Sequence, residues 1–386
     1  MNNQNKMAGA KKKIIFRNRS LEMGGIETVL LNILNHLDQD RYEIVLLLNY
    51  LQGEFIDRVP AHIRVHAVGE NSENFSKNVF LKFFQKIKRR LKYGFFEIFP
   101  SYFYKKNLLL DFDFEVAFSH YMMKSVLKSP NRKSKKIFWI HGDLRNSGFD
   151  RKQNQMFVDE MQQFDQGIFV SKHGKNVVEK NWNLELKNAE VFYNPLNIKQ
   201  IQAKALETVE EKYHDIDFVA VGRLFVAKGF ADLVEAHHQL ISEGYKIKTL
   251  LIGDGIQRKE LEDLIEKYRL KDTFFLYGFS ENPVKYVQNA RYFVLPSYSE
   301  SYPMVIGESL ILNKPVLATN VGGVSEMVKN EVNGLLFKPG KSDLYKTMKR
   351  VLDEPNLAEK LSAQDSLTEF QNRNEQIFQQ VDQLFN

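Results

Sequence analysis

The chain has 386 residues, a length that suits two domains better than one. Its 43% hydrophobic and 26% charged residues are typical of a globular protein, and a net charge of +6 is modest for this length. Because there is no cysteine, disulfides and thiolate metal sites are excluded. The N-terminus MNNQNKMAGAKKK lacks the apolar core of a signal peptide, and no run reaches the roughly 18 apolar residues of a spanning helix.

The first half of the chain alternates short apolar runs with helical periodicity, the pattern of a parallel sheet with crossover helices. A polar loop with Gly24 and Gly25 separates the first strand from a helix that begins near Ile26. Such glycines let the backbone approach a ligand, although many loops of this kind carry them only to turn. His141 directly follows another strand, at the sheet edge where open α/β sheets bind ligands. A lone histidine there is more often structural. The strands are predicted over residues 14–16, 42–49, 64–68, 115–119, 136–140 and 167–170.

Residues 75–106 form a basic and aromatic segment whose one acidic residue is Glu97. A helix of this composition suits an anionic membrane, with rings at the headgroup level and cations on phosphates. Two alternatives stay open: a helix packed on the sheet with a solvated basic face, and a nucleic-acid surface. We predict membrane contact through the basic residues Lys86, Lys88, Arg89, Arg90 and Lys92.

Asp111 and Asp113 form a D-x-D pair that could hold a divalent metal. In the fold where such a pair binds metal, it closes a buried strand. Here it precedes the strand 115–119, so we expect it to cap or turn into that strand. We predict no metal site and no cofactor.

The second half continues the same alternation and contains two cations on one loop. Arg223 and Lys228 lie between the strand 218–221 and the helix 230–241. Cations near a helix N-terminus suit a diphosphate, because charge-assisted contacts are strong and the helix dipole adds to them. Further strands are predicted over 248–252, 274–276, 292–295, 315–319 and 334–337, and further helices over 198–213, 257–268, 280–290, 342–352, 357–362 and 367–385.

Two carboxylates flank the end of the strand 292–295. Glu300 falls in the loop after the strand, and Glu308 falls in a helix that we expect to start near Pro303. Both therefore belong to the carboxyl edge of the sheet, where the amides of the helix N-terminus can seat a phosphate. An isolated pair of this kind would more often be two solvated surface glutamates. The strand, loop and helix, with a following strand and a Gly-Gly loop, favour a ligand site.

The stretch from Pro296, PSYSESYPMVIGESLILNKPVLATNVGGVSEMV, and the later NEVNGLLF resemble the family-4 retaining glycosyltransferases, or glycosyl transferases group 1. The resemblance implies the GT-B fold, in which two Rossmann-like parallel-sheet domains face each other across a cleft and a C-terminal helix crosses back. We expect domains at 1–195 and 196–365, with residues 366–386 forming the returning helix. The specific motifs cover nearly the whole second half, whereas the first half agrees only as a pattern.

The resemblance also implies roles for single residues. Arg223 and Lys228 would neutralise the departing diphosphate without a metal, Glu300 would hold the hydroxyls of the donor sugar, and Glu308 those of the ribose. His141 would approach the donor sugar. The other implied donor-binding residues are Gly24, Gly25, Gly222, Gly253, Gly278, Phe279, Ser301, Tyr302, Pro303, Met304 and Val305.

The predicted function is retaining transfer of a sugar from a UDP- or GDP-sugar, with UDP favoured, to a lipid-linked or growing glycan of a bacterial surface. We expect a cytoplasmic protein on the inner face of the membrane, without nucleic acid as a partner. Two alternatives remain: a non-catalytic partner of an active transferase, and a sugar-nucleotide epimerase of the same fold.

Overall fold

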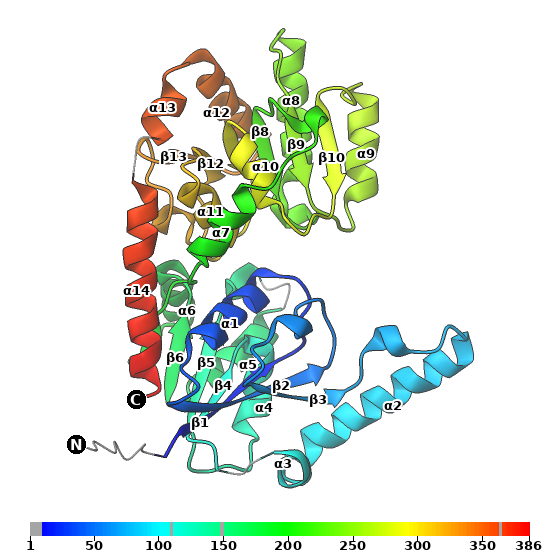
Figure 1. Ribbon diagram of the computed structural model, residues 1–386, viewed down its shortest axis with the longest axis vertical. Helices are drawn as coiled ribbons and strands as arrows, with labels where there is room; N and C mark the ends of the chain where they lie inside the picture. Colours follow the sequence, from blue (N-terminus) through cyan, green and yellow to red (C-terminus); the bar gives the residue numbers. More distant parts are fainter. Residues whose placement is uncertain (1–9, 109–110, 147–149, 363–364) are drawn as a thin grey trace, which may run out of the picture. The chain divides into compact units, whose positions relative to one another are not determined.

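The computed structural model describes residues 10–108, 111–146, 150–362 and 365–386. The chain divides into two compact units, each built around its own parallel sheet (Figure 1). Unit 1 comprises Met1–Val170, Lys175–Pro195 and Ile377–Asn386, and unit 2 comprises Ser171–Gly174 and Leu196–Gln376.

The sheet of unit 1 has seven strands in the order β3-β2-β1-β4-β5-β6-β7, and every pairing is parallel. All carboxyl ends therefore meet at one edge. The order reverses between β1 and β4, so that the loops after these two strands diverge to opposite faces of the sheet. The strands are β1 (Lys12–Asn18), β2 (Tyr42–Tyr50), β3 (Arg64–Gly69), β4 (Phe114–Ala117), β5 (Lys135–Ile140), β6 (Gln166–Phe169) and β7 (Ala189–Val191).

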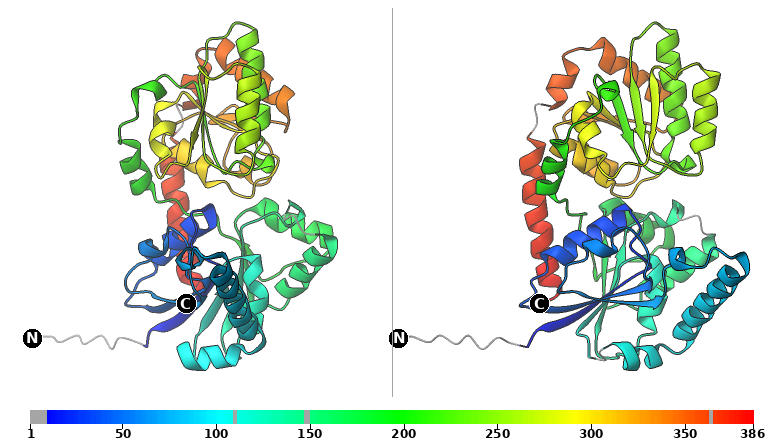
Figure 2. Two further views of the ribbon diagram at one scale, coloured as in Figure 1. Left: turned by 90° about the vertical axis from the view of Figure 1, so that its right-hand side faces the viewer. Right: turned by 45° about the vertical axis from the view of Figure 1, so that its right-hand side comes forward.

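Helices cover both faces of this sheet, as buried parallel strands require (Figure 2). One core cluster joins Phe138 of β5 to Val158 of α5, and another joins Ile15 of β1 to Phe96 of α2 and Tyr104 of α3. The helices are α1 (Gly25–His36), α2 (Val79–Ile98), α3 (Pro100–Asn107), α4 (Met123–Leu127), α5 (Arg151–Met161) and α6 (Lys172–Trp182).

The sheet of unit 2 has six strands in the order β10-β9-β8-β11-β12-β13, again all parallel. Here the order reverses between β8 and β11. The strands are β8 (Phe218–Val221), β9 (Thr249–Ile252), β10 (Phe274–Gly278), β11 (Tyr292–Leu295), β12 (Val316–Thr319) and β13 (Gly334–Phe337).

A large core cluster in unit 2 packs the strands against flanking helices, and includes Phe218 of β8, Phe230 of α8 and Met348 of α12. The helices of this unit are α7 (Ile198–Ala205), α8 (Phe230–Ser242), α9 (Arg258–Lys267), α10 (Val284–Asn289), α11 (Met304–Ile311), α12 (Lys341–Asp353), α13 (Leu357–Ser362) and α14 (Ser366–Leu384).

The last residues of the chain pack into unit 1, which confirms the predicted return of the C-terminal helix. The Phe385 ring meets Phe16 of β1 and Phe114 of β4 edge to face, with ring centroids 5.9 and 5.3 Å apart. His36 of α1 stacks on Phe378 at 4.1 Å and lies 3.3 Å from Asp382. Aromatic packing on the strands therefore anchors this end of α14.

The predicted helix over 198–213 is wrong in its second half, because α7 ends at Ala205. The chain leaves the helix to place Glu210 and Tyr213 against a tyrosine cluster. Glu210 accepts a hydrogen bond from the Tyr286 hydroxyl at 2.7 Å, and the Tyr213 ring packs on Tyr277 at 5.3 Å. Such contacts outweigh the small differences in helix propensity that suggested a longer helix.

Within the described ranges, no helix combines the length and the apolar character that crossing a bilayer requires.

Candidate functional site

The reversal point of the unit 2 sheet brings the loop after β8 against the loop after β11. The Lys228 Nζ atom lies 2.6 Å from Glu300 Oε1, and the Tyr298 amide donates to the Ala227 carbonyl at 2.8 Å. Two residues that the sequence separates by 72 positions therefore form an ion pair at the edge where α/β sheets bind ligands.

The Glu300 carboxylate is nearly buried, with 9% of its side chain exposed. Its Oε1 atom also accepts a hydrogen bond from Ser297 Oγ at 2.7 Å, whereas Oε2 has no partner in the described part of the chain. An ammonium group has three donors, of which Glu300 takes one. The pair can therefore still donate to an anion and accept from a hydroxyl.

Glycines allow these loops to pack together. Gly229 has φ +66°, and a Cβ atom there would lie 2.2 Å from the Pro296 carbonyl oxygen. Gly322 after β12 has φ +57°, and a Cβ atom would lie 1.6 Å from the Glu300 carbonyl oxygen. Both positions require glycine, because a side chain would be strained and would displace the loop that carries Glu300.

The other predicted glycines line up along the same edge. The Gly222 amide donates to the Ile252 carbonyl at 3.0 Å, and the Gly253 amide donates to the Gly278 carbonyl at 2.8 Å. The loops after β8, β9 and β10 are thus in register. Phe279, next in the chain, is exposed. This geometry is compatible with the predicted donor site, and the binding role of each residue stays a prediction.

Arg223 lies on the same loop as Lys228 but is not held in the ion pair. Its guanidinium lies over the Phe225 ring, 5.3 Å from the centroid, and the side chain is exposed. Among described residues it has no carboxylate partner, so the charge is available to an incoming anion.

Glu308 on α11 differs from Glu300, because its carboxylate forms no hydrogen bond or ion pair with any residue that the structure describes. Burial raises the pKa of Glu308, and the charge of Lys204 on α7 opposes this shift. A partly desolvated acid without a partner is poised to accept hydroxyl hydrogen bonds. Its predicted contact with ribose hydroxyls remains a prediction.

Helix α11 begins at Met304 with Pro303 as its N-cap, as predicted. The first amides of a helix lack intrahelical acceptors, so the backbone of residues 302–305 stays a candidate phosphate seat. The Tyr302 ring, however, is buried and its hydroxyl accepts a hydrogen bond from Arg373 Nη1 at 2.5 Å. Burial raises the pKa of Tyr302 to about 12, with Arg373 acting in the opposite direction. Its side chain therefore serves the protein interior rather than a ligand.

In unit 1, the predicted His141 follows β5 and lies among aromatic rings. Its ring centroid is 4.7 Å from that of Phe118 and 6.3 Å from that of Trp139, and neither ring nitrogen has a partner in the described residues. Burial, together with a smaller effect of the nearby His120, lowers the pKa of His141 to about 3. A neutral imidazole with unsatisfied nitrogens suits a hydrogen-bonding role, which stays a prediction.

Gly24 and Gly25 lie where predicted, in unit 1 at the junction between the β1 loop and α1. Gly24 is the N-cap and has φ −170°, an extended conformation open to any residue, and Gly25 is the first residue of α1. A Cβ atom on Gly24 would lie 2.6 Å from Glu27 Oε2, which the flexible glutamate could avoid by moving. Their contact with a donor phosphate remains a prediction.

Asp111 and Asp113 are occupied by Lys13 of β1, in keeping with a capping role. The Lys13 amide donates to Asp113 Oδ2 at 2.8 Å, and the Lys13 ammonium pairs with Asp111. Within the residues that the structure places, no three acidic or histidine side chains gather as metal ligands would.

The basic residues predicted to contact a membrane differ in their exposure. Lys86, Lys88, Arg90 and Lys92 are exposed on α2. Arg89 instead packs inward, its guanidinium 4.4 Å from the Tyr50 ring centroid and 5.2 Å from that of Phe75. We therefore leave Arg89 out of any proposed membrane surface.

Three residues near the site escaped the sequence analysis: Ser297, Lys204 and Arg373. Ser297 sits next to the predicted loop, so its place beside Glu300 could have been suspected. The other two come from helices distant in the sequence, and no local pattern indicates them.

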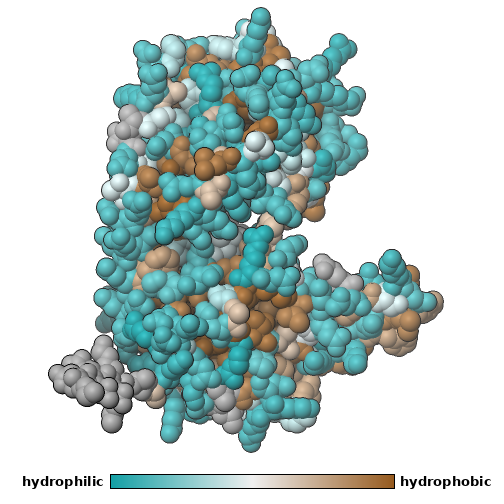
Figure 3. Space-filling view, in the orientation of Figure 1, coloured by the Kyte–Doolittle hydropathy of each residue, from teal (hydrophilic) through white to brown (hydrophobic). Residues whose placement is uncertain are grey.

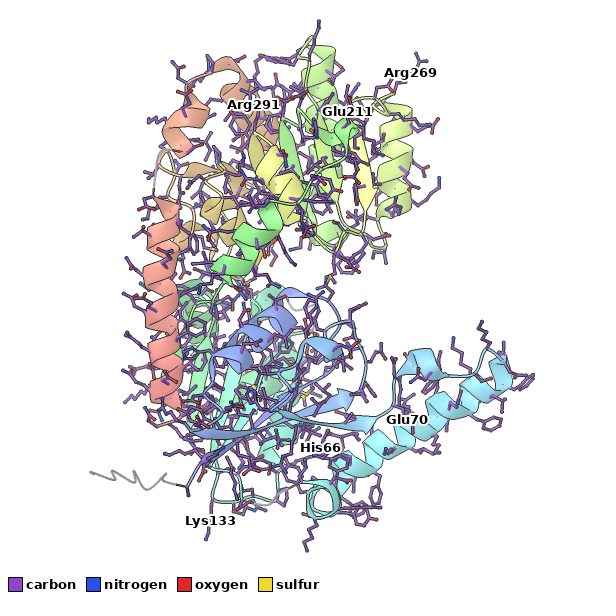
Figure 4. The ribbon with its side chains drawn as sticks, viewed as in Figure 1. His66, Glu70, Lys133, Glu211, Arg269 and Arg291 are labelled. Atoms are coloured by element: carbon purple, nitrogen blue, oxygen red, sulfur yellow. The ribbon has the colours of Figure 1, made fainter. Side chains whose placement is uncertain are left out.

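A surface hollow in unit 2 lies at the opposite, amino edge of the sheet, where Asp217, Lys248 and Arg291 line it. Arg291, which directly precedes β11, is labelled in Figure 4. Arg291 pairs with Asp217 at 3.1 Å. Because parallel sheets bind ligands at their carboxyl ends, we place the candidate site with Lys228 and Glu300.

A family model described as "Glycosyl transferases group 1" matches residues 202–366, a range that includes all six strands of unit 2. Among relatives, the chain is 29% identical over 189 residues to the N-acetylgalactosamine-N,N'-diacetylbacillosaminyl-diphospho-undecaprenol 4-alpha-N-acetylgalactosaminyltransferase of Campylobacter jejuni, covering 48% of this chain and 50% of the relative. It is 29% identical over 308 residues to the uncharacterized glycosyltransferase MJ1178 of Methanocaldococcus jannaschii, covering 75% and 79%.

It is also 29% identical over 154 residues to the capsular polysaccharide biosynthesis glycosyltransferase CapM of Staphylococcus aureus, covering 38% of this chain and 40% of the relative. The chain spans about half the length of the first of these relatives.

Solved structures share the fold along nearly the whole chain. Anabaena HepE in complex with UDP-glucose superposes with a TM-score of 0.76 at 19% identity, covering 96% of this chain and 98% of that one. TarM superposes with a TM-score of 0.76 at 12% identity, covering 98% and 100%. At these identities the likeness establishes the fold.

Proposed function

Because the chain belongs to the glycosyl transferases group 1 family, we propose that it transfers a sugar from a nucleotide-diphosphate sugar to an acceptor, with retention at the anomeric carbon. The observation that carries this proposal is the Lys228–Glu300 ion pair at the reversal point of the unit 2 sheet. It supplies a cation for the diphosphate and a free carboxylate oxygen for a sugar hydroxyl within one contact.

In the proposed reaction, the bond between the anomeric carbon and the diphosphate oxygen breaks while the acceptor oxygen bonds to the same carbon. The acceptor proton passes to the phosphate of the donor, so that charge and atoms balance. Lys228 and Arg223 stabilise the negative charge that grows on the departing diphosphate, most strongly in the transition state. Glu300 and Glu308 orient the sugar and the ribose through their hydroxyls.

We favour a UDP-sugar as the donor. Support comes from HepE, a protein of the same fold that was solved with UDP and with UDP-glucose. The loop after β10, with Gly278 and Phe279, would meet the base mainly through backbone groups, so the side chains do not distinguish uracil from guanine.

For the acceptor we propose a lipid-linked or growing surface glycan, which would place the protein at the inner face of a cell membrane. The name of the Campylobacter relative describes transfer onto a diphospho-undecaprenol-linked sugar, and that of the Staphylococcus relative describes capsule synthesis. Both relatives cover only part of this chain, so the acceptor class is an inference from similarity.

A donor panel tests the proposal. Purified protein is incubated with UDP- and GDP-sugars and lipid extracts, and released nucleotide and glycolipid are measured together. We expect UDP release that depends on one sugar, with retained anomeric configuration in the product. Nucleotide release without transfer, together with sugar epimerisation, would identify an epimerase, and the absence of any turnover would identify a non-catalytic partner.

A further inference from the structure

Helix α2 carries most of its apolar residues on the side that faces away from the rest of unit 1. Phe80, Phe84, Leu91 and Ile98 are 77%, 63%, 68% and 70% exposed, and hydrophobic atoms gather on the projecting α2 segment in Figure 3. With Ile87 and Phe95, these residues recur at helical spacing and form one continuous line, which we name the outer stripe.

The opposite side of α2 makes the contacts with unit 1. Phe96 is buried in a core cluster with Tyr104, and Tyr93 packs on Tyr50 with ring centroids 6.0 Å apart. Arg89 lies over the Tyr50 ring at 4.4 Å. Because this inner side already anchors the helix, the outer stripe is not needed to hold α2 in place.

An exposed apolar line of this extent costs free energy in water, and single proteins rarely present one without a partner. Basic residues border the stripe on both sides, with Lys88 and Lys92 along one side and Lys86 and Arg90 along the other. The acidic residue of α2, Glu97, is held by the Ser125 hydroxyl at 2.5 Å.

The basic residues beside the outer stripe determine which partner can cover it. Two copies of this chain that met through the outer stripe would bring their lysine and arginine borders together without an opposing carboxylate on α2, which is unfavourable. An anionic lipid surface accepts both features, since rings enter the boundary below the headgroups while the cations stay at the phosphates.

We propose that the outer stripe of α2 inserts into an anionic lipid surface, with Lys86, Lys88, Arg90 and Lys92 on the headgroup phosphates. This membrane surface rests on the proposed function in one respect: insertion would bring the protein to a lipid-linked acceptor. The principal membrane contact is then made by the apolar outer stripe, whereas the sequence predicted contact through the basic residues.

Vesicle binding by the full chain tests the surface. Sedimentation is measured with vesicles of phosphatidylcholine alone and with vesicles of equal parts phosphatidylcholine and phosphatidylglycerol. A variant carrying Phe84→Ser and Leu91→Ser should bind the mixed vesicles on the order of 10 to 100 times more weakly, because two inserted side chains are lost. A variant carrying Lys88→Gln and Lys92→Gln should lose roughly thirtyfold on mixed vesicles and little on neutral ones.

The matched control is Leu206→Ser, which removes an apolar side chain that is 87% exposed in unit 2 and should leave vesicle binding unchanged. Both α2 variants change exposed side chains, so UDP binding in the absence of vesicles should match that of the native protein. That measurement also verifies folding.

The outcomes separate this inference from the proposed function. Unchanged vesicle binding of the Phe84→Ser, Leu91→Ser variant overturns the membrane surface, even where sugar transfer is observed. A dimer in light scattering that the same substitutions dissociate, or RNA binding without lipid that they abolish, also overturns it. Stripe-dependent vesicle binding by a protein without turnover supports the surface and counts against the proposed function instead.

Discussion

The Lys228 Nζ atom lies 2.6 Å from Glu300 Oε1, and this ion pair ties the loop after β8 to the loop after β11. Both groups are largely shielded from water, so the contact is stronger than a surface ion pair. The pair is also incomplete, because the ammonium keeps two donors and Glu300 Oε2 has no partner in the described residues. A donor can therefore add its contacts without breaking the existing one.

Lys228→Ala tests whether this cation serves the leaving group. We expect kcat to fall about 100- to 1000-fold, the usual effect of removing one preorganised stabilising contact. Loss of the partner of Glu300 should also reduce stability by about 1–3 kcal/mol. Steady-state kinetics and thermal unfolding report the two effects. Lys175→Ala, which breaks the 2.9 Å pair with Glu179 at similar exposure, serves as control and should leave kcat unchanged. A similar kcat in both variants would rule out the role.

Glu308→Gln should separate binding from stability. Because burial raises the pKa of Glu308 and the carboxylate lacks a hydrogen-bonding partner among described residues, its charge opposes folding at neutral pH. A neutral amide removes this penalty, so unit 2 of the free protein should melt about 2–4 °C higher, the shift that ~1 kcal/mol produces in a domain of the size of unit 2. Calorimetry should show weaker UDP-sugar binding. Lower stability combined with unchanged binding would contradict both expectations.

Tyr302→Phe tests whether Arg373 positions the donor loop. The Tyr302 hydroxyl accepts from Arg373 Nη1 on α14, and hydrogen bonds to charged groups contribute about 1.5–3 kcal/mol. Without the hydroxyl, the loop before α11 loses this support, and we expect kcat/KM for the donor to fall about tenfold or more, mainly through KM. The control Tyr245→Phe removes the 2.5 Å bond to the exposed Asp353, and its kinetics should equal the native ones. Equal kinetics for Tyr302→Phe would exclude a positioning role.

His141 predicts a pH dependence of stability. Burial lowers its pKa to about 3, against about 6.5 in the unfolded chain, so the unfolded state binds more protons between these values. Stability should therefore fall as pH drops from about 6.5 towards 3. His141→Phe keeps an aromatic ring and should reduce the loss between pH 7.5 and 5 by up to about 2 kcal/mol. His120, whose pKa burial lowers to about 4, should retain part of the slope. Unfolding midpoints at the two pH values provide the measurement, and identical slopes would refute the assignment.

Metal removal tests the assignment of Asp111 and Asp113. Both interact with Lys13, and the cations Arg223 and Lys228 can neutralise a diphosphate themselves. We expect EDTA to leave turnover within about twofold of the untreated protein, a difference of less than ~0.5 kcal/mol in the barrier. Strict dependence on added Mg²⁺ or Mn²⁺, abolished by Asp111→Asn, would reverse this assignment.

The order of strands and loops in each unit follows from local sequence. Apolar runs such as Tyr292–Leu295, which ends directly before Pro296, become buried parallel strands because water excludes them and a breaker ends them. Loop residues after such strands fall at the carboxyl edge automatically. Glu300, Lys228 and His141 could therefore be placed at sheet edges from the sequence.

Partners across long separations were decided only by the tertiary structure. Glu300 contacts Lys228 and Ser297. Glu308, which was predicted to bind the same donor, is influenced by the charge of Lys204 and has no hydrogen bond in the described part of the chain. Local pattern indicates which edge a side chain reaches, but not which neighbour a crossover brings beside it.

Helix α2 shows the same division. Its sequence determines a helix with an apolar line, because Phe80, Phe84 and Leu91 recur at the helical period. Which side of α2 packs on the protein depends on the surface that the sheet presents. Arg89 and Tyr93 pack on the Tyr50 ring, and Tyr93 also contacts the core cluster that contains Phe96. Periodicity measures how strongly a helix is two-sided, whereas the choice of buried side belongs to packing among distant elements.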